Sequence, residues 1–149
     1  MRIHRRYWPL VVLATLPEGE RRLTPMQLQK TLFLISKNMS DELGKDYYDF
    51  VPYLYGPFAK GINQDVNDLI EEGLLTAVPA VDRSWNWYEL SASGFELGSL
   101  LSAKLSQDSR EYVEVAAQWV RTTPVGAMLR AIYEKYPEYA EKSVARLDS

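Results

Sequence analysis

The sequence predicts a mainly α-helical domain with a small β-hairpin, in which a winged helix-turn-helix-like core precedes further C-terminal helices. Three observations predict this class. Residues 57–72 form a strongly amphipathic segment that ends at Gly73. Two short apolar segments, 74–78 and 85–90, follow the glycine and are separated by a turn. A further helix start comes directly afterwards, so the order is helix, glycine, hairpin and helix, which is typical of a winged helix.

The length and composition predict a single domain over residues 1–149, with flexible ends at 1–8 and 140–149. The apolar run at 10–16 is much shorter than the about 20 residues that a membrane-spanning helix needs. Pro17 follows this run where a signal peptide would place small residues. We therefore expect a soluble cytoplasmic protein with no membrane partner. The absence of cysteine excludes thiol catalysis and thiolate zinc sites.

Two helices are expected before the amphipathic segment. The first has Pro9 in its first turn and stops at Pro17. The second begins at Thr24-Pro25, an N-cap residue followed by proline at the first helical position. Its apolar residues recur every three or four positions and predict one buried stripe: Leu28, Leu32, Ile35 and Met39. The polar side chains expected away from this stripe are Gln27, Lys30 and Lys37.

The aromatic segment 47–55 cannot continue the second helix, because Pro52 and Gly56-Pro57 interrupt it. Its aromatic residues favour an extended or short strand conformation. Pro57 is then expected to open the helix 57–72, and Gly73 is expected to cap its C-terminus in the left-handed conformation. The predicted core face of this helix comprises Phe58, Ile62, Val66, Leu69 and Ile70.

Three more helices are expected after the hairpin. Ser91 and Ser93 both qualify as the N-cap of the first, and Ser93 and Glu96 have capping-box spacing. The next helix spans about 109–120. Thr123-Pro124 starts the last helix, and Pro137 ends it.

The uneven distribution of charge favours a protein partner over DNA. Residues 1–30 hold six basic side chains and two acidic ones, whereas residues 41–75 hold eight acidic and two basic. A DNA-binding winged helix places positive charge on its reading helix. Here that helix carries four acidic side chains that are expected on its outer face: Asp65, Asp68, Glu71 and Glu72. These carboxylates would repel phosphates.

We therefore predict a surface that binds a partner protein, such as a toxin or another regulated protein. Tyrosine and phenylalanine make good anchors because they bury a large area with few rotatable bonds. The carboxylates on the same segment would suit a basic or polar partner. The predicted protein-binding residues are Tyr53, Tyr55, Phe58, Asp65, Asp68 and Glu72. Most other aromatic side chains of this segment are expected in the core.

The alternative is a DNA-binding transcriptional regulator, for which a homodimer is expected. Asparagine and glutamine are suited to reading adenine edges. The residues for this role are Lys60, Asn63, Gln64, Asn67 and Arg83. The basic side chains available for phosphates are Arg2, Arg5, Arg6, Arg21, Arg22 and Arg83. The sequence leaves open whether they converge on DNA or pair with the acidic segment.

The residue inventory argues against an enzyme. His4 is the sole histidine, which excludes a multi-histidine metal site. There is no phosphate-binding glycine loop and no nucleophile elbow. The acidic residues at 41–49 lack calcium-loop spacing. We therefore expect no catalytic residues, no metal and no cofactor.

Three segments resemble the SocA-like antitoxin or Panacea-domain proteins and the related small bacterial proteins of the YwgA type. They read LTPMQLQKTLFLI (23–35), YDFVPYLYGPFAKGINQDVNDLIEEGLL (48–75) and IYEKYPEY (132–139). The resemblance implies a non-enzymatic regulator, either an antitoxin or an accessory to a mobile or defence element, that acts by holding a partner protein. The residues that match the motif are Leu28, Gln29, Lys30, Tyr55, Gly56, Pro57 and Phe58.

Overall fold

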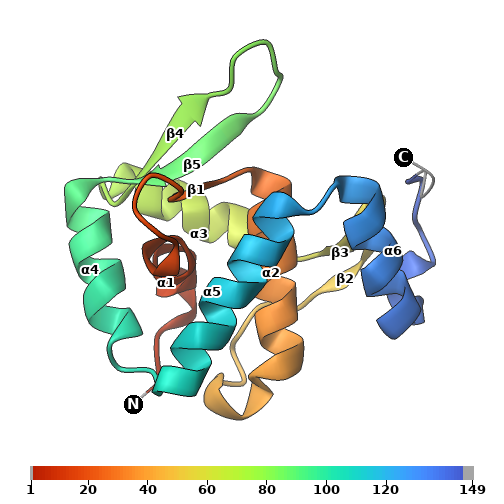
Figure 1. Ribbon diagram of the computed structural model, residues 1–149, viewed down its shortest axis with the longest axis horizontal. Helices are drawn as coiled ribbons and strands as arrows, with labels where there is room; N and C mark the ends of the chain where they lie inside the picture. Colours follow the sequence, from red (N-terminus) through yellow and green to blue (C-terminus); the bar gives the residue numbers. More distant parts are fainter. Residues whose placement is uncertain (1, 146–149) are drawn as a thin grey trace.

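The computed structural model describes residues 2–145 and is mainly helical, with six α-helices, a small three-stranded antiparallel sheet and a two-stranded one in that range (Figure 1). The helices are α1 (Trp8–Thr15), α2 (Pro25–Asn38), α3 (Lys60–Glu71), α4 (Ala92–Ser102), α5 (Gln107–Thr122) and α6 (Val125–Lys135). The strands are β1 (Arg22–Leu23), β2 (Val51–Tyr53), β3 (Gly56–Phe58), β4 (Leu75–Pro79) and β5 (Asn86–Leu90). Single 3-10 turns are η1 (Arg5–Tyr7), η2 (Ser40–Glu42) and η3 (Pro137–Ala140).

Helix α1 lies among α4, α5 and α2 (Figure 1). It is apolar on every side, and its residues 8–13 are all buried, as expected of a helix surrounded by others. Pro9 lies in its first turn, as the sequence predicts. The end expected to be flexible, 1–8, contributes η1 and the buried Trp8. The other expected flexible end lies outside the described residues from position 146 onward.

Helix α2 begins as predicted, at Thr24 and Pro25. The Gln27 backbone N–H donates to Thr24 Oγ1 over 3.1 Å, and the Thr24 N–H donates to Gln27 Oε1 over 2.9 Å. This capping box satisfies two backbone donors that would otherwise lack partners. One side of α2 packs in the larger core, and Phe33 belongs to a second core that α6 and η3 complete.

Helix α3 ends at the predicted glycine cap. Gly73 has φ +76°, and Leu74 N–H donates to Leu69 O over 2.9 Å, which is the bond of a Schellman cap. The chain then enters β4 and returns in β5, and this hairpin projects from the helical body (Figure 1). The two-residue β1 pairs with the other edge of β5, so the strand order is β1-β5-β4.

Helix α3 starts later than predicted. Pro57 does not open it, because Pro57 lies in β3 and pairs with Pro52 of β2. Ala59 is still extended, and the helix begins at Lys60. Ser91 resolves the choice of cap for α4, since its Oγ accepts from Gly94 N–H at 3.0 Å. Within residues 2–145 no helix has the length and apolar character needed to cross a bilayer.

Candidate protein-binding surface

The aromatic hairpin, which comprises residues 51–58, presents a group of exposed apolar side chains. Strands β2 and β3 are joined by a two-residue turn, Leu54-Tyr55. Val51, Tyr53, Leu54 and Tyr55 are each between 42% and 48% exposed. Phe58 is half-buried and stacks on Tyr53 with their ring centroids 4.9 Å apart. A concentration of large apolar side chains on one short hairpin is typical of an interaction site.

The strand register decides which side chains share a face of the aromatic hairpin. Val51 lies opposite Phe58, and Pro52 lies opposite Pro57. Directly opposed side chains lie on one face, and alternate residues of a strand do the same. Val51, Tyr53 and Phe58 therefore form one face, while the two prolines form the other. Pro57 is buried on that second face.

Two polar side chains of α2 hold the backbone next to this hairpin. The Gln29 amide donates from Nε2 to Ala59 O over 3.0 Å and accepts from Ala59 N–H at Oε1 over 2.9 Å. Lys30 Nζ donates to Pro57 O over 3.0 Å. These bonds join the LQK and YGPF segments, which are 27 to 30 residues apart in the chain. The motif residues Gln29 and Lys30 therefore act on the shape of the hairpin base.

The expectation that Lys30 lies away from the buried stripe of α2 is wrong. Its side chain is 3% exposed, and burial lowers its pKa to about 8. The spacing of the apolar residues does not indicate this burial. The aromatic hairpin covers positions of α2 beside the apolar stripe, and Lys30 is one of them. Gly56 also belongs to this contact. It has φ +87°, and a Cβ there would lie 2.8 Å from Leu129 Cδ2 and 3.3 Å from Lys30 Cε.

Asp65 is not on the outer face of α3, and this expectation too is wrong. Its side chain is buried and forms an ion pair with Arg5, with 3.1 Å between Arg5 Nε and Asp65 Oδ2. Tyr48 Oη donates to the same Oδ2 over 2.7 Å. Burial and the neighbouring carboxylate raise the pKa of the Tyr48 phenol. The spacing of the buried residues Ile62, Asp65, Val66 and Leu69 places Asp65 on the core face.

The predicted protein-binding residues therefore separate into two groups. Tyr53, Tyr55 and Phe58 lie together on the aromatic hairpin. Asp68 accepts from Gln64 Nε2 over 3.0 Å, and Glu72 forms an ion pair with Arg6. Glu72 lies twelve residues beyond Lys60, which is about 18 Å along the helix axis. The acidic group thus lies at the far end of α3 from the hairpin.

The residues proposed for DNA are all exposed. Lys60, Asn63, Gln64 and Asn67 lie on α3, and Arg83 lies in the turn between β4 and β5. Of the arginines expected to cover phosphates, Arg5 lies beside Lys60 and Gly61 at the start of α3. Arg5 and Arg6 pair with acids of α3, as described above.

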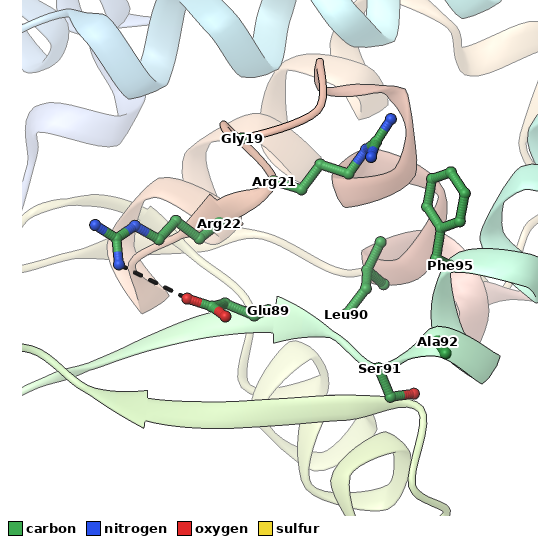
Figure 2. A pocket seen from close by; sticks show the side chains of 8 residues that line it. All are labelled: Gly19, Arg21, Arg22, Glu89, Leu90, Ser91, Ala92 and Phe95. Carbon is green, nitrogen blue, oxygen red and sulfur yellow. Dashed lines mark ion pairs between the residues drawn. The ribbon is translucent and has the colours of Figure 1, made fainter.

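Arg21 and Arg22 line a separate open pocket of about 440 Å³ beside β5 and the start of α4 (Figure 2). Arg22 Nη1 lies 3.7 Å from Glu89 Oε2, and its guanidinium covers Trp87 at 4.4 Å from the ring centroid. The Arg21 guanidinium covers Phe95, also at 4.4 Å. Both arginines therefore have partners within the chain.

An open groove of about 600 Å³, here called the hairpin groove, runs along the exposed face of the aromatic hairpin. Its boundaries are η1, the segment 47–49, the hairpin and the first turn of α3. Val51, Tyr53 and Phe58 form its apolar wall, and Arg5 and Lys60 also line it. The sequence predicts neither the groove nor the strand pairing that shapes it, because Pro57 before an amphipathic segment indicates a helix start.

Comparison with known proteins leaves the family open. No protein-family model matches the chain, and no curated protein matches it.

The burial of Lys30 predicts how stability depends on pH. Its pKa is 10.5 when solvated and about 8 in the fold, so between these values the unfolded chain binds more protons. Stability from this group should therefore rise with pH in that window and be lost as the pH falls through 8. From pH 8 to about 9.5 the free energy of unfolding should rise by about 1–2 kcal/mol. Denaturant titration should show this rise in the parent chain and not in Lys30→Met; parallel curves would contradict it.

The ion pair of Asp65 predicts a structural role. Asp65→Ala should lower the free energy of unfolding by about 2–3 kcal/mol, less than for a fully buried pair because the Arg5 side chain is one-third exposed. Asp68→Ala, an acidic residue of the same helix outside this network, should change it by less than about 0.5 kcal/mol. Equal effects of the two substitutions, measured by urea unfolding, would show that the buried network contributes nothing.

Proposed function

We propose that this chain is a non-enzymatic module that binds a partner protein through the aromatic hairpin. The observation that carries the proposal is the set of four exposed apolar side chains at 51–55. The backbone at the base of this hairpin is held by hydrogen bonds from Gln29 and Lys30 of α2. Apolar side chains on a rigid base bind at a low entropic penalty, because little of the surface has to be ordered.

The proposed architecture is a winged-helix core followed by helices α4 to α6. Its support is the order α1, β1, α2, α3, β4, β5, with β1 added to the β4–β5 hairpin. In a winged helix such a hairpin flanks the second helix of the helix-turn-helix pair, which would be α3 here. The β2–β3 hairpin and the helix α6 are additions to that core.

The resemblance to SocA-like antitoxins favours a toxin or another regulated protein as the partner. The motif residues support an interaction role in two ways. Tyr55 and Phe58 belong to the proposed surface, while Gln29, Lys30 and Gly56 shape the backbone that presents it. The proposed setting is a toxin–antitoxin or defence system of a bacterial cytoplasm.

A second candidate is a winged-helix transcriptional regulator. One observation favours it: Asp65 and Glu72 are paired with Arg5 and Arg6, so the reading helix is less acidic than its sequence indicates. The exposed Lys60, Asn63, Gln64 and Asn67 would then face the major groove. Protein binding remains the first proposal, because Arg22 is already paired with Glu89 and the Arg21 guanidinium covers Phe95.

If the proposal holds, tyrosine substitutions on the hairpin should weaken a partner complex without unfolding the chain. Tyr53→Ala and Tyr55→Ala should each raise the Kd of a purified complex at least about tenfold, as expected for interface hot spots. The products of the genes on either side of this one are the partners to test first, by titration calorimetry. Val115→Ala, a matched exposed apolar residue on α5, is the control and should leave the Kd unchanged. Equal effects of the control and the tyrosine variants would argue against this surface.

DNA binding makes a different prediction. Affinity for a promoter fragment should fall steeply as salt rises, because bound phosphates release counterions. Arg83→Glu should abolish retardation in a gel, whereas Arg130→Glu on the exposed surface of α6 should not. Failure to retard DNA at low salt would remove this candidate.

A further inference from the structure

We propose that the hairpin groove takes a segment of the partner in which a large apolar side chain lies within about two residues of a carboxylate. This inference rests on the proposed protein-binding function and specifies the chemistry of the partner. It also changes the expected charge of the partner, since the sequence indicated a basic or polar one.

The apolar side chain is selected by the wall of the groove. Val51 and Tyr53 are both nearly half exposed on the face that Phe58 shares. Phe58 is held against Tyr53 by ring stacking, so the two rings form one continuous surface. An aliphatic or aromatic side chain of the partner would cover this surface and remove it from water.

The carboxylate is selected by Lys60. This side chain is exposed at the groove, and it forms no ion pair within the described range 2–145. Lys60 follows Phe58 by two residues across the extended Ala59, so their Cα atoms are about 7 Å apart. A carboxylate within about two residues of the apolar anchor therefore reaches the ammonium group.

Arg5 adds hydrogen-bond donors near Lys60, although its charge is already paired with that of Asp65. Its guanidinium is fixed by Asp65, and it covers the Tyr48 ring at 5.0 Å from the centroid. Gly61 lies next to this guanidinium, since a Cβ there would be in ordinary contact with Arg5 Nη1 at 3.4 Å. The guanidinium edge that does not bind Asp65 retains N–H donors for a carboxylate.

One acidic side chain of the groove sets a limit on the acidity of the partner segment. Asp49 also lines the groove and is exposed, so a uniformly acidic segment would meet repulsion there. The best complement is a single carboxylate next to the anchor, with neutral or basic residues toward Asp49. A preference for one carboxylate next to an apolar anchor distinguishes the groove from a uniformly basic surface.

The test uses the full chain and phage-displayed short random peptides. Enriched peptides should carry a large apolar residue with Asp or Glu within two positions, and their affinity is measured by fluorescence polarisation. Lys60→Glu should weaken their binding about tenfold, because an attraction becomes a repulsion. Panning on Lys60→Glu should select Lys or Arg at the same position. Arg110→Glu is the control, since Arg110 is also an exposed cation in the first turn of a helix.

The outcomes separate this inference from the function on which it rests. If Tyr53→Ala weakens binding and Lys60→Glu does not, the carboxylate preference is overturned and the protein-binding surface stands. If neither variant changes binding, both proposals fail. Recovery of only basic peptides, or of none, overturns the carboxylate preference. Self-association that Lys60→Glu disrupts would assign the groove to a second copy of the chain and overturn it as well.

Discussion

The contact of Gln29 and Lys30 with the backbone at 57–59 is the constraint on which the proposed binding surface depends. A buried amide that donates to and accepts from one residue fixes the position and the direction of that backbone. The buried Lys30 adds a second fixed point at Pro57 O. Between them they set where β3 ends, where α3 begins and how the aromatic hairpin is presented. Both side chains come from one turn of α2, so the hairpin base moves with the helical core.

Internal ion pairs change the meaning of the charge asymmetry. The sequence separates a basic N-terminal segment from an acidic segment at 41–75, and the fold brings parts of them together. Arg5 pairs with Asp65 and Arg6 pairs with Glu72, so η1 lies along α3. The acidic character of α3 is partly neutralised within the chain. The charges that remain exposed at the hairpin groove are those of Lys60 and Asp49, which the residue count alone does not indicate.

Local signals in the sequence predicted much of the fold. The Thr24-Pro25 cap, the Gly73 cap and the β4–β5 hairpin each depend on a few neighbouring residues, and the structure places them as expected. The β2–β3 hairpin was missed because proline before an amphipathic segment usually opens a helix, and here it pairs with Pro52 instead. The burial of Lys30 depends on contacts 27 residues away, which helical periodicity cannot indicate. Asp65 was predictable in principle, since it has the spacing of the core face, but its charge argued for the surface.

The paired prolines, Pro52 and Pro57, have a consequence for solubility. An exposed strand with apolar side chains is a template for uncontrolled pairing between chains, because its free N–H and C=O groups accept another strand. Proline has no N–H, and both strands of this hairpin carry one at the same register position. The hairpin can therefore expose apolar side chains while its backbone resists the growth of intermolecular sheets. Replacement of Pro52, the less buried of the two, would restore a backbone donor on this hairpin.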